Sequence, residues 1–118
     1  RPAVVADGQK VLSAATVKQM REMLEGVVVS GTGTKAAVEG YSAAGKTGTA
    51  QKPMKDRPGY GDEYTSIFAG FVPAEDPQIT IVVVLDEPDD HSAGRAVAPV
   101  FAAIATETLA TIGVPETE

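Results

Sequence analysis

The feature that most constrains this chain is a cluster of prolines and glycines just after a short Lys-Thr-Gly sequence. Two prolines and two glycines lie between positions 53 and 61. Proline lacks an amide hydrogen and glycine is unfavourable in a helix, so no long helix can occupy this stretch. Residues 52–63 are therefore expected to form a loop. Residues 42–51, which are small or β-branched, are expected to form the strand that precedes it.

Two further strands are predicted downstream. Residues 64–72 end at Pro73, and residues 79–85 end at Asp86. The second run is almost continuously apolar, which predicts burial on both of its faces. The connection between the two runs is short enough for an antiparallel hairpin.

Two helices are predicted on either side of these strands, after a short extended stretch at residues 3–5. The first begins near Ser13 or Thr16, which are equally suitable caps, and ends at the glycines of residues 31–33. The second spans residues 96–112, with Pro99 in its first turns or at a kink. The expected inward-facing residues of the two helices are Val17, Met20, Leu24, Val27 and Val28, and Val97, Val100, Phe101, Ile104 and Thr108. The order of elements predicts an α+β fold, an antiparallel sheet flanked by helices.

Composition excludes several classes of function. Ten basic residues against 16 acidic ones give a net charge of −6, which argues against a general nucleic-acid binder. Cysteine is absent, so disulfides and thiolate metal sites are excluded. No apolar run approaches the roughly 20 residues of a membrane span. We therefore expect no transmembrane segment, no metal and no cofactor.

A few polar residues invite a functional interpretation that the pattern does not favour. His91 is the only histidine and is expected to be an exposed loop residue, because no nucleophile or ligand motif accompanies it. Asp86 and Glu87 could form a metal-binding pair, but a strand end followed by proline predicts an ordinary turn. Lys52, with its basic neighbours, is expected in the solvated loop.

One motif leaves a nucleotide-binding function open. Residues 40–47 match the P-loop pattern G-x-x-x-x-G-K-[ST], and residues 81–87 resemble a Walker B strand. A P-loop works because a helix begins directly after the Lys-Thr pair and its N-terminus holds the phosphates. The prolines and glycines after residue 52 oppose such a helix, so a P-loop NTPase is the less favoured hypothesis.

The favoured hypothesis treats the same lysine and threonines as part of a strand. Alternation then places Thr47 and Thr49 on one face, with Gly48 between them carrying no side chain. At a sheet edge such a strand can pair with an extended peptide. The Lys46 ammonium and the two hydroxyls would meet the peptide's terminal carboxylate, and a backbone N–H could stabilise an oxyanion. The alternative is a plain threonine-rich strand with an exposed lysine.

Four stretches of the sequence form a recognisable set: residues 31–34 (G-T-G-T), 44–51 (A-G-K-T-G-T-A-Q), 68–74 (F-A-G-F-V-P-A) and 98–101 (A-P-V-F). Together they resemble the penicillin-binding protein transpeptidases, most closely the class B enzymes of cell division and elongation. K-T-G is one of the motifs of this superfamily. The resemblance implies that residues 1–118 are the C-terminal segment of a single transpeptidase domain, with a β-lactamase/transpeptidase-like fold and the K-T-G strand at the edge of the active site.

The resemblance also implies an activity and a location. A serine attacks the D-Ala-D-Ala end of a peptidoglycan stem peptide, and β-lactam antibiotics acylate the same serine. Lys46 would help to hold the proton network and the substrate carboxylate, which Thr47 and Thr49 would bind. The Thr49 N–H would form half of the oxyanion hole, and Gly48 would leave room for substrate. The protein would act at the extracytoplasmic face of the membrane, anchored by an N-terminal region outside this sequence.

Two motifs of that family are missing here. No serine is followed three residues later by lysine, and the chain contains no asparagine, so neither S-x-x-K nor S-x-N can be present. The nucleophile would have to come from an upstream segment, as a missing piece or a second chain, and the fragment alone should be inactive and unstable. A D,D-carboxypeptidase, a β-lactamase or a β-lactam sensor shares K-T-G, and a non-catalytic peptide-binding remnant is a further possibility.

Overall fold

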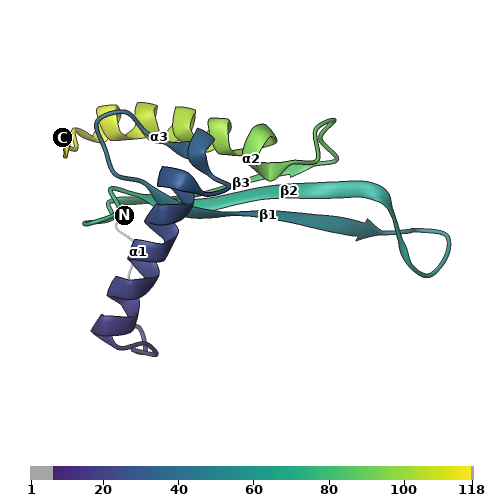
Figure 1. The fold of residues 1–118 in the computed structure, drawn as a ribbon, viewed down its shortest axis with the longest axis horizontal. Coiled ribbons are helices and arrows are strands. Elements are labelled where there is room, and N and C mark those ends of the chain that lie inside the picture. The colour runs from purple at the N-terminus through teal and green to yellow at the C-terminus, as the bar shows by residue number, and fades with distance from the viewer. Residues whose placement is uncertain (1–6, 118) are drawn as a thin grey trace.

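The computed structural model describes residues 7–117, so the extended stretch expected at residues 3–5 lies outside the described residues. Three strands form one sheet and helices pack around it, which confirms the predicted α+β class (Figure 1). In chain order the elements are α1 (Ala14–Ser30), the 3₁₀ turn η1 (Thr34–Ala36), β1 (Ala44–Pro53), β2 (Tyr60–Val72), β3 (Ile79–Asp86), α2 (Ala93–Ala96) and α3 (Ala98–Ile112).

The sheet is antiparallel with the strand order β1-β2-β3, as two consecutive hairpins require. In this register Thr47 lies opposite Phe68, which in turn lies opposite Val83. Strand β1 is therefore an edge strand, with β2 on one side and no strand on the other among residues 7–117. The segment that carries the Lys-Thr-Gly sequence is thus a strand at the sheet edge, as predicted.

The β1–β2 hairpin is longer than the sequence predicted. Its strands extend to Pro53 and Tyr60, so only residues 54–59 form the loop, and the expected loop at 52–63 was wrong. The ladder continues through an irregularity between Gln51 and Pro53, and Gly59 makes the turn with φ = 106°. Figure 1 shows the result, a two-stranded arm that projects well beyond the rest of the molecule.

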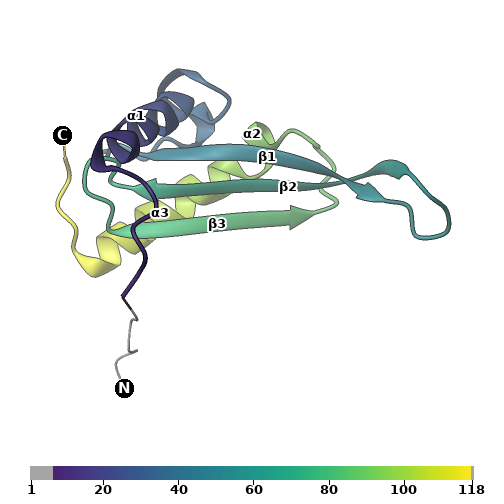
Figure 2. The same ribbon diagram turned by 90° about the horizontal axis from the view of Figure 1, so that it is seen from below.

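Helix α1 begins at Ser13, whose hydroxyl accepts a hydrogen bond from the Thr16 amide at 3.1 Å. Its C-terminal end packs beside β1, where Val28 is buried. The expected inward face holds only for that end, because Met20 is 41% exposed. The N-terminal turns of α1 extend away from the sheet (Figures 1 and 2).

The second predicted helix is two helices that meet at Val97, and Pro99 lies in the first turn of α3. The buried residues of α3 recur every three or four positions, at Ala98, Phe101, Ala105 and Leu109. The expected inward face was therefore wrong for Val100 and Ile104, which are exposed. This narrow stripe of buried residues is enough to pack α3 against the sheet, because the helix lies along the flat face of the sheet.

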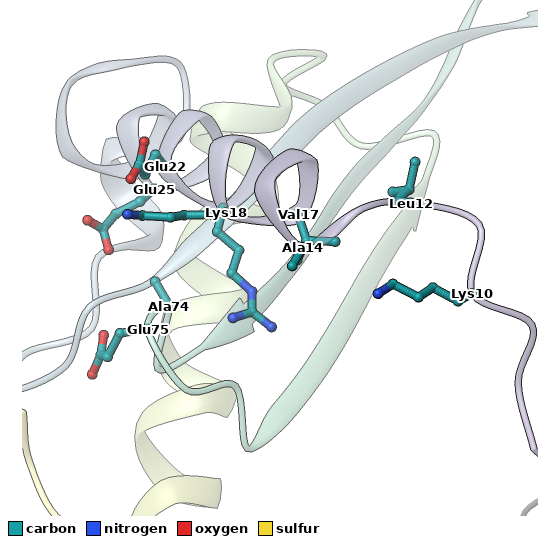
Figure 3. Close-up of a pocket in the computed structure, with 10 residues that line it drawn as sticks. Lys10, Leu12, Ala14, Val17, Lys18, Glu22, Glu25, Ala74 and Glu75 are labelled. Atoms are coloured by element: carbon teal, nitrogen blue, oxygen red, sulfur yellow. The ribbon is translucent and has the colours of Figure 1, made fainter.

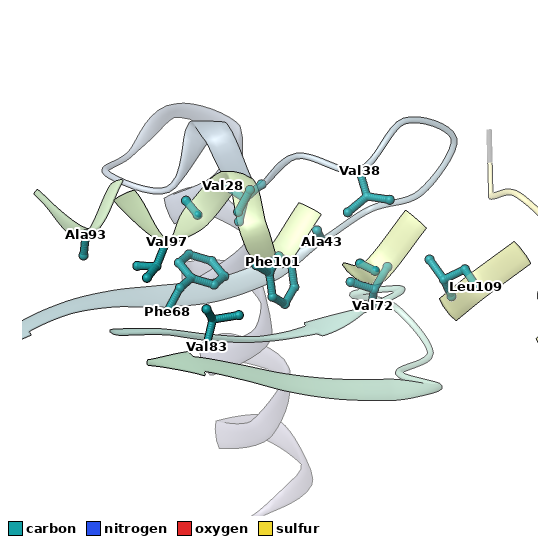
Figure 4. Packing of buried hydrophobic residues seen from close by; sticks show 13 residues of the cluster. Val28, Val38, Ala43, Phe68, Val72, Val83, Ala93, Val97, Phe101 and Leu109 are labelled. Carbon is teal, nitrogen blue, oxygen red and sulfur yellow. The ribbon is translucent and has the colours of Figure 1, made fainter. Parts of the chain in front are cut away.

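The core lies between this helix pair and one face of the sheet (Figure 4). The rings of Phe68 and Phe101 pack with their centroids 4.7 Å apart. Gly70 makes this possible, because a Cβ there would lie 2.9 Å from the Phe101 ring. The larger members of the cluster are Val28, Val38, Phe68, Val72, Val83, Val97, Phe101 and Leu109.

Strand β3 is buried on one face only. Val83 points to the core, whereas its neighbours Val82 and Val84 are 59% and 55% exposed. The predicted burial on both faces was therefore wrong for the described part of the chain. Helix α3 covers one face of β3, and no element from residues 7–117 covers the other, which faces the viewer in Figure 2.

The segment Ala93–Ile112 is long and apolar enough to cross a membrane, judged by length and composition alone. The expectation that no apolar run approaches 20 residues was therefore wrong. Within this fold the segment supplies Val97, Phe101 and Leu109 to the core, which is the position of a core helix.

Candidate functional site

The two threonines of the Lys-Thr-Gly-Thr sequence share one face of β1, as their spacing predicted. Both Thr47 and Thr49 line a cavity of about 420 Å³. Its other walls are the turn at residues 32–35 and the start of α2 at residues 92–95. The structure thus brings the K-T-G strand together with the G-T-G-T turn, although the two are separated in the sequence.

Lys46 places its ammonium group at the same point of the strand. Its Nζ donates to the Thr47 carbonyl at 3.0 Å and lies 3.2 Å from the Thr47 hydroxyl. The Thr47 hydroxyl is also 2.9 Å from the hydroxyl of Thr32. One cation and two hydroxyls are therefore contiguous, and the two threonines that carry the hydroxyls line the cavity, a combination suited to a carboxylate.

The backbone of β1 offers further polar groups at this position. Along a strand, backbone groups alternate in direction, so the amide and carbonyl of Thr49 point the same way as those of Thr47. The Thr47 carbonyl is the one that accepts from the Lys46 side chain rather than serving only the sheet. This geometry indicates that the Thr47 and Thr49 backbone groups face the unpaired edge of β1, where an extended peptide can bond to them.

Gly48 differs from the other glycine in this strand. A Cβ at Gly45 would lie 2.6 Å from the Ala69 carbonyl oxygen, so packing excludes a side chain there. A Cβ at Gly48 would meet only the Ile67 Cβ, at 3.9 Å. Contacts within residues 7–117 therefore do not require glycine at position 48.

The walls of the cavity are held together by close backbone contacts. A Cβ at Gly94 would lie 2.5 Å from the Thr32 carbonyl oxygen, so α2 can approach the turn only through a glycine. Gly33 is buried, and a Cβ there would lie 3.1 Å from both Phe68 and Val27. The contacts of Gly33 explain why glycine occupies the third position of the G-T-G-T turn.

The loop after β3 contributes a contact that sequence reasoning missed. The His91 carbonyl accepts hydrogen bonds from Thr49 at 3.3 Å and from the buried Ser66 at 3.2 Å. The His91 ring packs on Tyr64 with centroids 4.3 Å apart. His91 is exposed, as expected, but its loop is fixed to the sheet. A backbone carbonyl leaves no signal in the residue pattern, so the sequence could not have indicated this role.

Lys52, on the edge strand β1, is bonded to the end of the other edge strand, β3. Its Nζ lies 2.9 Å from Asp86 Oδ1 and 2.7 Å from Glu87 Oε1. The prediction that Lys52 lies in a solvated loop was wrong, because β1 continues to Pro53. Lys52 lowers the pKa of both carboxyl groups, and its own pKa is raised by its hydrogen bonds to Glu87 and Asp86.

Two further acidic groups are tied into this part of the molecule. A hydrogen bond with Glu87 raises the pKa of Glu63. The Arg95 guanidinium donates to Asp90 at 2.7 Å and lowers the pKa of that carboxyl group. Asp86 and Glu87 end the strand, as expected, and residues 7–117 contain no cluster of three or more His, Asp or Glu side chains that could hold a metal.

The P-loop hypothesis is wrong. The Lys-Thr pair lies inside β1, and the chain continues as a strand to Pro53. The helix N-terminus that would bind nucleotide phosphates is therefore absent at this sequence.

A larger hollow lies elsewhere, beside the N-terminal half of α1, with a volume of about 610 Å³ (Figure 3). Leu12 and Val17 contribute apolar surface, and Lys18, Glu22 and Glu25 contribute charges. It shares no lining residue with the cavity at Thr47 and Thr49.

The comparison with known proteins agrees with this geometry. A family model described as the penicillin binding protein transpeptidase domain matches residues 3–106. Stage V sporulation protein D of Bacillus subtilis is 42% identical over 90% of this chain and 17% of its own length. Penicillin-binding protein PbpB of Mycolicibacterium smegmatis is 41% identical over 92% of this chain and 18% of its own length.

Solved structures show the same fold. The transpeptidase domain of Burkholderia pseudomallei penicillin-binding protein 3 superposes with a TM-score of 0.84 at 40% identity, covering 94% of this chain and 34% of that chain. Penicillin-binding protein 3 of Mycobacterium tuberculosis complexed with ampicillin superposes with a TM-score of 0.79 at 38% identity. That match covers 90% of this chain and 26% of that chain. This chain thus spans about a third or less of these relatives. Strand edge, turn and cavity together with these matches establish that the chain belongs to the penicillin-binding protein transpeptidase family, in its class B branch.

Proposed function

We propose that this chain forms the substrate-binding edge of a serine D,D-transpeptidase that cross-links peptidoglycan stem peptides. In this proposal residues 1–118 are the C-terminal segment of one transpeptidase domain. The nucleophilic serine comes from a segment outside the sequence, because S-x-x-K is absent here. Several relatives bear the name peptidoglycan D,D-transpeptidase, which supports the assignment.

One observation carries the proposal: the Lys46 ammonium and the Thr47 hydroxyl lie 3.2 Å apart at the edge of β1. The terminal carboxylate of a D-Ala-D-Ala peptide would accept hydrogen bonds from the hydroxyls of Thr47 and Thr49, beside the Lys46 charge. The peptide backbone would add to β1 as a further strand, with Gly48 leaving room beside it.

The same edge would stabilise the reaction. When the serine attacks the penultimate carbonyl, negative charge develops on its oxygen, and the Thr49 N–H would donate to it as half of the oxyanion hole. D-Ala then leaves and the acyl group remains on the serine. An amine of a second stem peptide accepts the acyl group, which completes the cross-link and frees the serine. Residues of this chain bind and orient the peptide, and no cofactor is required.

β-Lactam antibiotics would acylate the same serine, with their carboxylate bound by Thr47 and Thr49. Relatives solved with ampicillin and with aztreonam support this part of the proposal. We further propose that the protein acts in division or elongation at the extracytoplasmic face of the membrane, anchored by a region outside this sequence. Relatives in the class B branch support that location.

The test is acylation of the longer protein that contains this segment by a fluorescent penicillin. Replacing Thr47 or Thr49 with valine should slow acylation about tenfold or more, because each hydrogen bond to a carboxylate contributes roughly 1.5–3 kcal/mol. Thr80→Val is the matched control, since Thr80 is exposed on the opposite face of the sheet. Equal rates for all three variants would overturn the proposal.

Product analysis separates the transpeptidase from related enzymes. With a donor stem peptide and an acceptor amine, a transpeptidase forms the cross-linked dimer. A D,D-carboxypeptidase or a β-lactamase instead passes the acyl group to water, and a sensor retains it.

A further inference from the structure

The loop from Glu87 to Ser92 crosses from one face of the sheet to the other. It leaves β3 at Asp86 and reaches the cavity face, where the His91 carbonyl bonds to Thr49 and Ser66. Its first residue, Glu87, has a left-handed backbone with φ = 53°, and its amide donates to the Tyr64 carbonyl at 2.8 Å. The direction in which the loop departs is therefore set at Glu87.

Lys52 binds both residues at that departure point. One ammonium group contacts Asp86, the last residue of β3, at 2.9 Å and Glu87, the first residue of the loop, at 2.7 Å. Asp86 also accepts a hydrogen bond from Thr65 on β2 at 3.3 Å. The bridge thus spans all three strands and joins the exit of β3 to β1, three residues beyond Thr49.

The C-terminal end of the loop, at His91, holds the orientation of the Thr49 side chain. The Thr49 hydroxyl donates to the His91 carbonyl, which fixes the rotamer of the side chain, and its single proton turns to a ligand carboxylate when one binds beside it. The next residues, 92–95, form one wall of the cavity. A shift of the loop would therefore release the Thr49 side chain and displace the cavity wall at the same time.

We propose that Lys52 is a positioning residue, whose bridge to Asp86 and Glu87 holds the loop that orients Thr49 and closes the cavity. This inference rests on the proposed function, because it concerns the same site. Lys52 lies on the opposite face of the sheet from the cavity, so it touches no substrate and acts through the loop.

The experiment compares Lys52→Met, Lys52→Arg and Lys55→Met in the longer protein that contains this segment. Methionine keeps the length of the side chain without the charge, and arginine can still reach both carboxylates. Lys55 lies in the hairpin turn, outside the bridge, and provides the matched control. Three properties are measured: the rate constant for acylation by fluorescent penicillin, amide hydrogen exchange at residues 89–93, and the thermal midpoint.

Lys52→Met should slow acylation about threefold to tenfold, because small misplacements at a reacting site are costly. It should raise exchange at residues 89–93 and leave the thermal midpoint within about 2 °C of the wild type, since an exposed ion pair contributes little stability. Lys52→Arg should restore both acylation and exchange, and Lys55→Met should match the wild type.

Unchanged acylation and exchange in Lys52→Met would overturn the inference. So would a fall in the thermal midpoint large enough to account for the slower acylation, because that describes a structural role alone. If the wild type is not acylated at all, the proposed function fails. The exchange measurement then still decides whether Lys52 holds the loop.

Discussion

The hydroxyl groups of Thr32 and Thr47 lie 2.9 Å apart and join the G-T-G-T turn to the K-T-G strand. Thr32 follows the end of α1, and Thr47 lies on the edge strand beside the Lys46 ammonium. Because either hydroxyl can donate, the pair can reorient its protons when an anion enters the cavity. The turn is therefore part of the site as well as the end of a helix.

Replacing Thr32 with valine should slow acylation of the longer protein by fluorescent penicillin about threefold to tenfold. The Thr47 hydroxyl loses its partner, and a hydrogen bond contributes roughly 0.5–1.5 kcal/mol. Thr32 is exposed, so the thermal midpoint should change little. A Thr32→Ser variant, which keeps the hydroxyl, should retain most of the rate. Equal rates for the valine and serine variants would contradict this account of the pair.

The two glycines of β1 should respond differently to alanine. Gly45→Ala should destabilise the fold strongly, because the new Cβ would lie 2.6 Å from the Ala69 carbonyl oxygen. Gly48→Ala meets open space and should leave the thermal midpoint unchanged while slowing acylation, since a peptide or β-lactam would pack there. Midpoints and acylation rates of both variants are the measurement. A Gly48→Ala protein with wild-type acylation would show that no ligand packs at position 48.

The ion pairs of Lys52 should stabilise the protein from mildly acidic pH upward and should lose this effect in strong acid. Lys52 lowers the pKa of Asp86 and Glu87 from their ordinary values of 3.8 and 4.5. Their contribution is therefore present above those values and is lost as the pH falls through the lowered pKa values. The contribution of Glu63 to stability has the opposite pH dependence. Its pKa is raised by the hydrogen bond with Glu87, so its contribution is lost as the pH rises.

The measurement is the difference in thermal midpoint between wild type and Lys52→Met across the pH range. The small difference at pH 7 should vanish as the pH falls through the lowered pKa values of the two carboxyl groups. A difference that persists in acid would mean that the Lys52 side chain acts by packing and not by its charge.

The purified chain of residues 1–118 should not melt cooperatively and should not be labelled by fluorescent penicillin. Val82 and Val84 leave one face of the sheet apolar and exposed, and Met23 on α1 is 59% exposed. The sequence also contains no S-x-x-K nucleophile. Calorimetry and a labelling gel are the measurements. A sharp melt would show that these surfaces need no cover, and labelling would show that the chain carries its own nucleophile.

The local rules of backbone chemistry predicted much of the site. Prolines and glycines after the Lys-Thr pair argued against the nucleotide-binding helix, and period-two alternation put Thr47 and Thr49 on one face, as the structure has them. The same rules placed the start of the loop too early, at residue 52. A two-stranded ribbon can continue through Pro53 because proline is tolerated at an unpaired edge, which the sequence pattern does not identify.

Features that depend on tertiary structure could not be predicted. The apolar run of β3 resembles a strand buried on both faces, and its one-sided burial follows from which elements lie within residues 7–117. The inward face of α3 shifted to Phe101, Ala105 and Leu109 because the Phe101 ring packs over Gly70 and against the Phe68 ring. The hydrogen bonds of the His91 carbonyl and the ion pairs of Lys52 join residues that are far apart in the sequence. The local spacing of residues therefore could not predict them.

The central claim is that the edge of β1 binds the carboxylate of the substrate or of a β-lactam. The most direct measurement is a crystal structure of the longer protein acylated by a penicillin. We predict that the ligand carboxylate lies within about 3 Å of the Thr47 and Thr49 hydroxyls and that the acyl oxygen accepts from the Thr49 N–H. A carboxylate bound elsewhere, or another strand of the protein paired along that edge of β1, would contradict the account.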